Sequence, residues 1–213
     1  KLRNIVSYAE LKSYYSTDTD GTIAPIYDTG ITRLSGNAPR DWYKTVTEEL
    51  QFQGSAMNNL LTYTFGGFYY KQSPKGRMEN HSINVCSSKV IEECRFGESL
   101  IGVTNESKAL YAQGTLDFGV LTPSLAKLRL TAGYRYTWDT VEGFTASWNY
   151  TPVGNQQFGQ LCAWKFQFTN NPEADCRFDA RQKSSSPNWT VGLDYRPMSE
   201  LMFYGKVTKG YKA

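Results

Sequence analysis

Residues 127–139 read KLRLTAGYRYTWD and alternate between apolar and polar side chains almost without a break. In an extended strand, successive side chains point to opposite faces, so one face would carry the apolar set and the other the polar set. The apolar set is Leu128, Leu130, Ala132, Tyr134, Tyr136 and Trp138, and the polar set is Arg129, Thr131, Gly133, Arg135, Thr137 and Asp139. A soluble β-sandwich and a membrane barrel both produce this pattern, so the rest of the chain must discriminate between them.

The composition favours a mostly β protein. The 213 residues include 11 Phe, 15 Tyr and 18 Gly, and few segments have a helical period. No apolar run approaches the length of a spanning helix, but barrel strands carry polar residues at every second position and need no such run. The 23 basic and 20 acidic side chains are spread along the chain and give a net charge of +3, so we expect no nucleic-acid partner.

Seven segments have the alternation and the flanking turn residues of strands. They are residues 2–15, 43–54, 60–71, 107–118, 127–139, 188–196 and 201–211. The connections between them alternate strictly between long (17–42, 72–106, 140–187) and short (54–59, 119–126, 197–200). In a meander this places every long loop at one end, as in outer-membrane barrels, whereas compact soluble domains rarely contain three such structureless connections. We therefore predict an all-β, antiparallel up-and-down meander of about seven strands, part of a large transmembrane β-barrel with long loops on one side.

The strand dimensions agree with that prediction. About ten residues at ~3.3 Å each, tilted by roughly 45°, rise on the order of 23 Å, close to the ~25 Å apolar band of such barrels. We expect the apolar faces to meet lipid and the polar faces to line a lumen. The charged residues expected in the lumen, where they pair with one another or contact an anionic ligand, are Asp117, Arg129, Arg135, Asp139, Asp194, Lys206 and Lys209.

Several of these strands resemble those of the β-barrel of TonB-dependent outer-membrane receptors. The segments TEELQF (47–52) and FGGFYY (65–70) are similar to the "S-x-E-L-R-L" and "G-x-F-Y" strands of that family. The segments ALYAQ (109–113) and LTAGYRYT (130–137) are similar to its "A-x-F-x-Q" and "L-T-x-G-x-R-Y-T" strands. Residues 191–195 and 203–212 resemble its "Y-x-x-V-S-R-G-Y-K-S-G-G-F" region. Order and spacing agree over most of the chain outside the long loops.

The resemblance implies a receptor of the bacterial outer membrane that binds a scarce nutrient or metal chelate, commonly a ferric siderophore. It also implies import past a plug domain, energised by the TonB complex through regions that residues 1–213 lack. Plugged transporters have about 22 strands, so these residues are expected to be a partial barrel domain without its plug and remaining strands. The implied partners are outer-membrane lipid, the TonB complex and the transported small molecule.

The four cysteines form two close pairs, Cys86 with Cys94 and Cys162 with Cys176, each in a polar segment. Two local disulfides are the preferred interpretation and imply an oxidising compartment, and four unpaired thiols are the alternative. No Cys-x-x-Cys spacing occurs and His81 is the only histidine, so we expect no metal site.

We expect neither catalysis nor a cofactor. His81, interpreted as a solvated loop residue, leaves a Ser-His-Asp arrangement without a base. Glu48 and Glu49 are neighbours on a strand and point to opposite faces, so they cannot share a substrate. Gly66 and Gly67 have no following helix or lysine with which to hold a phosphate, and glycine in a strand more often relieves crowding.

Aromatic side chains in the long loops are the candidate ligand contacts, although they can equally pack within their own loops. They are Trp42, Tyr43, Trp148, Tyr150 and Trp164. Two other classes of protein stay open: a passive outer-membrane porin and a soluble secreted β-sandwich binding module. Asn-x-Ser/Thr triplets at Asn80, Asn105, Asn149 and Asn188 give the sandwich weak support as glycosylation sites.

Overall fold

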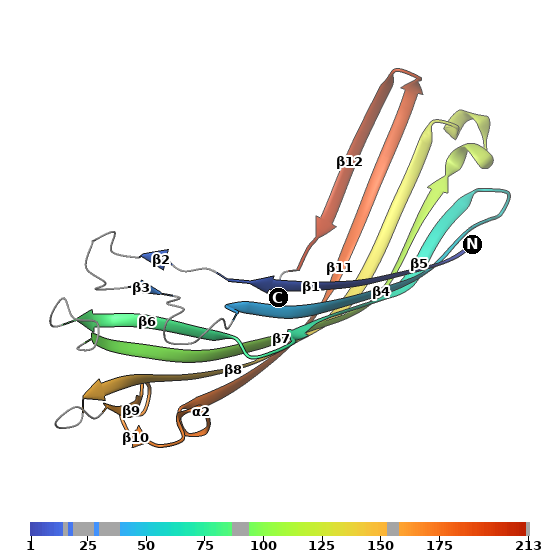
Figure 1. Ribbon diagram of the computed structural model, residues 1–213. Helices are drawn as coiled ribbons and strands as arrows, with labels where there is room; N and C mark the ends of the chain where they lie inside the picture. The colour runs from blue at the N-terminus through green and yellow to red at the C-terminus, as the bar shows by residue number, and fades with distance from the viewer. Residues whose placement is uncertain (15–16, 19–27, 30–38, 87–93, 153–157, 212–213) are drawn as a thin grey trace.

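The computed structural model describes residues 1–14, 17–18, 28–29, 39–86, 94–152 and 158–211. All of its strands belong to one antiparallel sheet, and seven long strands follow one another across that sheet in chain order (Figure 1). They are β1 (Leu2–Ser13), β4 (Asp41–Ala56), β5 (Leu61–Pro74), β7 (Cys94–Asp117), β8 (Leu128–Pro152), β11 (Arg177–Met198) and β12 (Leu201–Lys209). The predicted seven-stranded meander is therefore confirmed.

The long connections contain more regular structure than the sequence suggested. Strands β7 and β8 have 24 and 25 residues and remain paired far beyond their predicted ends. β6 (Glu79–Cys86) pairs with β7, followed by β3 (Asp28–Thr29) and β2 (Thr17–Asp18), whereas β9 (Phe158–Cys162) pairs with β8 and with β10 (Phe168–Thr169). The expectation of structureless loops over 72–106 and 140–187 is thus wrong, because backbone pairing continues where the apolar alternation weakens. Val46, Lys71, Glu106, Thr140 and Lys183 lie in one lateral row of the sheet. We call the described residues on the side of this row away from the short connections the outer extension.

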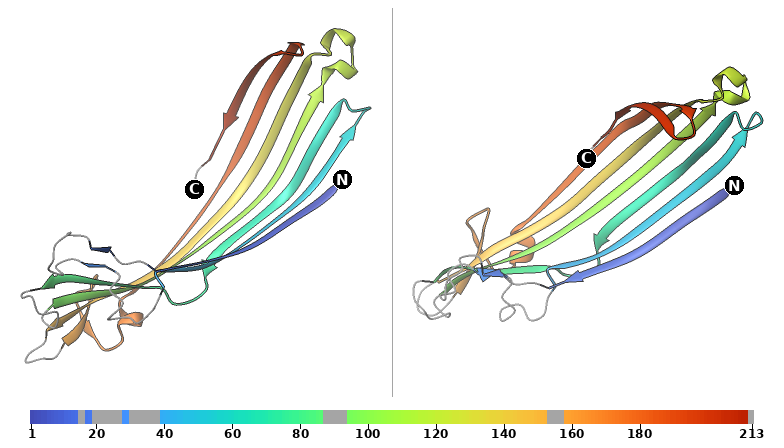
Figure 2. Two further views of the ribbon diagram at one scale, coloured as in Figure 1. Left: turned by 45° about the horizontal axis from the view of Figure 1, so that its top comes forward. Right: turned by 90° about the horizontal axis from the view of Figure 1, so that it is seen from above.

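The short connections all lie at one end of the sheet, and the outer extension lies at the other end (Figure 2). The β4–β5 turn places Met57, Asn58 and Asn59 at positive φ, a conformation that Asn tolerates better than most residues. Two short 3-10 helices, Phe118–Val120 and Pro123–Leu125, join β7 to β8. Asp117 caps the first of them by accepting a hydrogen bond from Gly119 N at 3.0 Å. The separation of short and long connections to opposite ends of the sheet agrees with the predicted meander.

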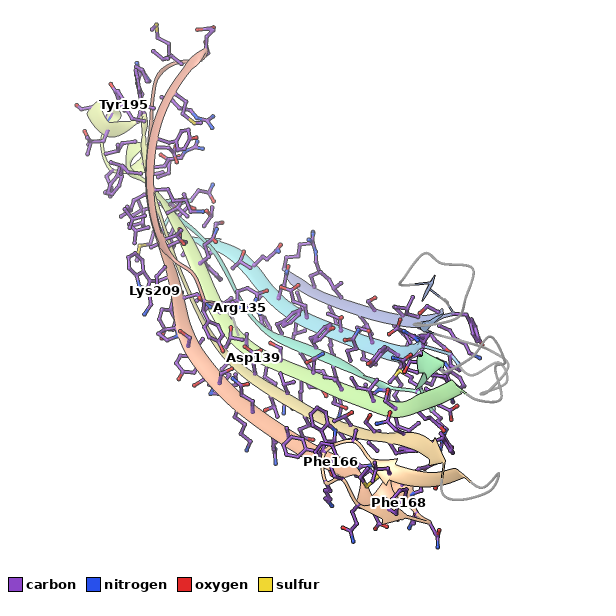
Figure 3. The ribbon with its side chains drawn as sticks, turned by 90° about the vertical axis from the view of Figure 1, so that its left-hand side faces the viewer. Arg135, Asp139, Phe166, Phe168, Tyr195 and Lys209 are labelled. Atoms are coloured by element: carbon purple, nitrogen blue, oxygen red, sulfur yellow. A yellow bond between two sulfur atoms is a disulfide. The ribbon has the colours of Figure 1, made fainter. Side chains whose placement is uncertain are left out.

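The register divides the sheet into two faces. β7 and β8 pair without a shift from Phe96 opposite Tyr150 to Asp117 opposite Arg129, so each face is continuous along both strands. One lateral row on the first face consists of Leu2, Phe52, Phe65, Ala112, Tyr134 and Trp189. The sheet is curved, with Tyr195 and Lys209 on its convex face and Arg135 and Asp139 on its concave face (Figure 3). Tyr134 pairs with Trp189, and Trp189 pairs with Lys209, so Tyr134 belongs to the convex face.

The described strands form no second sheet that could cover the apolar face. This excludes the β-sandwich alternative for the described part of the chain, since a sandwich buries such a face between two sheets. The sheet is also open: among the described residues, β1 pairs only with β4 and β12 only with β11. No helix in the described ranges is long and apolar enough to cross a membrane.

Candidate functional site

The convex face carries an exposed apolar band. On β8 the band runs from Leu128 to Trp138, and ten residues at ~3.3 Å with a tilt of roughly 45° rise about 23 Å. Its side chains are open to the surroundings; Leu110 is 60 % exposed and Tyr134 is 52 % exposed. A monomeric soluble protein rarely exposes so wide an apolar surface, and a lipid-facing barrel wall requires one.

A row of charges lies at the outer border of the band. Lys108 is next to Trp138 in the register, and its Nζ lies 2.6 Å from Glu106 Oε1. Lys71 Nζ lies 3.7 Å from the other oxygen of Glu106. Further out on the same face, Arg181 pairs with Glu142 at 2.8 Å. The change from aromatic to charged side chains marks the level at which lipid would give way to water.

The concave face at the same height is polar and internally bonded. Tyr111 on β7 donates its hydroxyl to Glu49 Oε1 on β4 at 2.5 Å, although β5 lies between these strands. Gln51 also donates to Glu49 Oε1, at 2.9 Å, and Gln53 donates to Gln51 at 2.8 Å. Gly66 on β5 makes the crossing possible, because a Cβ there would lie 2.9 Å from the Tyr111 hydroxyl and 2.2 Å from Leu50 O.

The charged residues assigned to a lumen lie on this concave face, with one exception. Arg135 donates from Nε to Thr137 Oγ1 at 3.2 Å, and its guanidinium lies 5.0 Å from the ring centre of Phe68. Arg129 pairs with Asp117 at 3.1 Å. The register places Asp194 beside Arg129, Lys206 beside Gly192 in the row of Thr131, and Asp139 beside Ser107 in the row of Ser184.

Lys209 is the exception, and its assignment to the lumen is wrong. It pairs with Trp189 and lies on the convex face, away from Arg135 and Asp139 (Figure 3). The reason is the period of two: residues 206 and 209 are three apart, so they cannot share a face of one regular strand.

The concave face contains an open depression of about 370 Å³ between β4, β7, β8, β11 and β12. Its lining includes Glu49, Tyr111, Gln113, Arg135, Asn188 and Lys206. Asn188 Oδ1 is buried and has no hydrogen-bond partner among the described residues. The depression therefore offers cationic and amide groups to whatever occupies the interior.

The five aromatic candidates lie in different surroundings. Trp42 donates from Nε1 to Glu10 at 2.8 Å and stacks under Lys12, whose Nζ is 4.3 Å from the ring centre. Tyr43 is half-buried, and burial raises the pKa of its hydroxyl. Trp164 is 69 % exposed in the β9–β10 connection.

Trp148 and Tyr150 lie on the convex face of the outer extension. Trp148 is 2 % exposed and packs with Leu100, Ala146 and a disulfide between Cys162 and Cys176. We call this group the Trp148 cluster. Helix α2 (Pro172–Asp175) ends at Cys176 and lies against β8. The backbone also places Cys86 opposite Cys94, but the side chains of that pair lie outside the described part of the structure.

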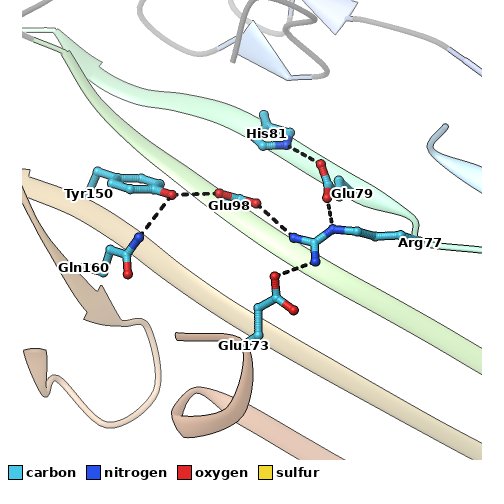
Figure 4. Close-up of polar contacts among 7 residues, drawn as sticks. All are labelled: Arg77, Glu79, His81, Glu98, Tyr150, Gln160 and Glu173. Carbon is cyan, nitrogen blue, oxygen red and sulfur yellow. Dashed lines mark hydrogen bonds and ion pairs between the residues drawn. The ribbon is translucent and has the colours of Figure 1, made fainter. Parts of the chain in front are cut away.

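A cluster of charged residues adjoins the Trp148 cluster, because Glu98 lies opposite Trp148 in the register of β7 and β8. Figure 4 shows the contacts of these charged residues. Arg77 forms ion pairs with Glu79, with Glu98 at 3.7 Å, and with Glu173 of α2. His81 Nε2 lies 3.3 Å from Glu79 Oε2. On the other side of Glu98, Tyr150 donates its hydroxyl to Oε2 at 2.9 Å and is itself approached by Gln160 at 3.4 Å.

The interpretation of His81 as a solvated loop residue is wrong. His81 lies on β6 opposite Glu98 of β7 and is only 4 % exposed. Burial lowers the pKa of His81 below its ordinary value; Arg77 and Arg40 act in the same direction, and Glu98 opposes them. The spacing Glu-x-His on an extended strand was a signal for a shared face, but its partner Glu98 could be found only from the register of β6 against β7.

Comparison with known families identifies the chain. The family described as "TonB dependent receptor-like, beta-barrel" matches residues 2–213. The chain belongs to this family, whose members are outer-membrane receptors that act in transport. Searches of curated proteins and of solved structures give no significant match.

Proposed function

We propose that the chain is part of the wall of an outer-membrane receptor that binds a scarce nutrient, such as a ferric siderophore, and imports it with energy from the TonB complex. The observation that carries the proposal is the exposed apolar band on the convex face opposite a bonded polar face at the same height. A wall between lipid and a wet or plugged interior needs both surfaces.

The outer extension would supply the first contacts with the ligand. Trp164 is the most exposed of the five aromatic candidates, and Tyr43 lies on the face opposite Trp42 of the same strand, in the register of the concave residues. Stacking on aromatic rings suits planar chelating groups, and the Arg135 and Lys206 side chains would attract anionic ones further inside. Trp148 is packed in its own cluster and would act by holding the extension in shape.

The open edges of the sheet support the proposal that other parts of the receptor complete the barrel. An unpaired strand edge in lipid leaves backbone N–H and C=O groups without partners, so β1 and β12 need neighbours. A plug domain inside the completed barrel would face the depression lined by Arg135, Asn188 and Lys206. TonB would act on that plug.

Uptake by the full-length receptor tests the proposal. The receptor is expressed in a bacterial strain without other siderophore receptors, with and without functional TonB, and supplied with radioactive iron bound to catecholate or hydroxamate chelators. We expect accumulation of at least one chelate only where TonB is present. Uptake that is independent of TonB, together with steady ion conductance in planar bilayers, would instead identify a passive porin.

A pair of variants locates the binding surface. Trp164→Ala should weaken binding of the imported chelate to whole cells, because it removes an exposed ring from the outer extension. Val120→Ala, at an exposed residue of the short-connection end, is the control and should leave the affinity unchanged.

A further inference from the structure

Three side chains with metal-binding atoms converge on the outer extension. Glu79 and His81 are two residues apart on β6 and share a face, and Glu98 lies opposite His81 on β7. One donor atom from each residue lies within 4.8 Å of the others. The three side chains are also enclosed: His81, Glu79 and Glu98 are 5 %, 11 % and 12 % exposed.

We propose that Glu79, His81 and Glu98 form a binding site for a divalent transition-metal ion of the Zn²⁺ type. One imidazole and two carboxylates are a ligand set that such ions accept, with one coordination position left for water. Metal–ligand distances of about 2.1 Å in a tetrahedral shell separate neighbouring ligand atoms by about 3.4 Å. His81 Nε2 and Glu79 Oε2, at 3.3 Å, already have that separation.

The Glu98 carboxylate is oriented for this role by its neighbours. Tyr150 donates to Oε2 at 2.9 Å, and Gln160 approaches the Tyr150 hydroxyl at 3.4 Å, which leaves Oε1 directed toward Arg77 (Figure 4). Metal sites are commonly supported by hydrogen bonds of this kind, which fix the orientation of a ligand. The site is therefore more than a group of acidic residues at a surface.

Arg77 is the resident counter-ion and the competitor of the metal. Two enclosed carboxylates need a positive charge nearby, and the Arg77 guanidinium supplies it by pairing with both Glu79 and Glu98. Its side chain is 47 % exposed, so it can turn toward solvent. A bound M²⁺ ion would neutralise both carboxylates and leave Arg77 paired with Glu173 of α2 alone. Metal and Arg77 thus compete for the same two carboxylates.

Zinc binding to the purified full-length receptor tests the inference. The protein is stripped with a chelator, and binding is measured by equilibrium dialysis with radioactive Zn²⁺. His81→Asn and Glu98→Gln should each remove or weaken one saturable site at least about tenfold, since loss of even a supporting group costs about 10- to 100-fold. Arg77→Gln should strengthen the same site by about two- to fivefold, the range of a surface ion pair.

The matched control is Glu106→Gln, which removes a carboxylate from the same strand outside the cluster and should leave zinc affinity unchanged. Heat-dependent mobility on gels checks that each variant is folded. The proposal is overturned if folded His81→Asn and Glu98→Gln both bind zinc like the wild type, or if neither wild type nor Arg77→Gln has the site. Equal competition by Mg²⁺ would also overturn it, because that ion prefers oxygen ligands and would not need His81.

Discussion

The two halves of β8 carry similar side chains on the same face, but these side chains differ in how exposed they are. In the half that carries the apolar band, Tyr134 and Trp138 are 52 % and 45 % exposed, whereas Trp148, further along the same face, is 2 % exposed. Strand β7 repeats the contrast, with Leu110 at 60 % and Leu100 at 7 %. The outer half is covered by its own disulfide-linked segment and α2, and the inner half is left bare. Such a difference is expected where the surrounding medium changes from lipid to water along one strand.

The largest expected effect is loss of the Trp148 cluster. Trp148→Ala removes a buried indole and should destabilise the outer extension by about 3 to 5 kcal/mol, while the membrane-level part of the sheet stays folded. Amide hydrogen exchange of the full-length receptor in detergent would locate the change. Trp164→Ala, which removes an exposed indole, should cost less than about 0.5 kcal/mol. Equal exchange in both variants would contradict the contrast between the halves.

A charge placed at two heights on the convex face of β11 tests where lipid ends. Val191 is level with Ala132, near the middle of the band, and Val191→Arg should destabilise the barrel by about 2 to 4 kcal/mol. Ser185 is level with Trp138 at the border, and Ser185→Arg should cost about 0 to 1 kcal/mol. Refolding of the receptor into liposomes from urea measures both. If the two variants are equally stable, the band does not face lipid.

The polar network of the concave face predicts a smaller effect. Tyr111→Phe removes the hydroxyl that reaches Glu49 across Gly66 and should cost about 1.5 to 3 kcal/mol, the range of a hydrogen bond to a charged group. Tyr134→Phe, on the convex face of β8, is the matched control and should be close to neutral. Urea refolding compares the two, and an equal loss in both would show that the concave hydroxyl has no special partner.

The smallest effect is expected from the exposed ion pair of the outer extension. Glu142→Gln breaks the contact with Arg181 and should change stability by about 0.2 to 1 kcal/mol, because both side chains remain hydrated. The difference should shrink further in high salt. Thermal unfolding at low and at high ionic strength measures it, and a loss as large as that of Val191→Arg would mean that lipid extends above the charged row.

The strands at membrane height could be predicted from the sequence because one physical constraint repeats there at every second residue. Leu128 to Trp138 alternate since one side must be apolar and the other polar, and the seven segments with this pattern are the seven long strands. Beyond Trp138 no lipid enforces the alternation, so β7 and β8 continue for many residues that the pattern did not reveal.

The charged cluster could not be predicted for a related reason. His81 and Glu98 are 17 positions apart in sequence and meet only through the pairing of β6 with β7. Strand register beyond the membrane depends on backbone pairing and on packing around Trp148, which a single sequence does not display. The face of Lys209, by contrast, could be predicted from the sequence alone, because Lys209 is three positions from Lys206 on one strand and must lie on the other face.

The unbroken ladder between β7 and β8 has a mechanical consequence. From Trp138 to Pro152, at ~3.3 Å per residue, β8 continues on the order of 46 Å past the border of the band. Its hydrogen bonds to β7 run without a shift from Phe96 to Asp117. A paired ribbon of this length is stiff. A force on its outer end, where a ligand would first bind under the proposed function, would therefore tilt the strands below it, whereas a flexible loop would absorb the force.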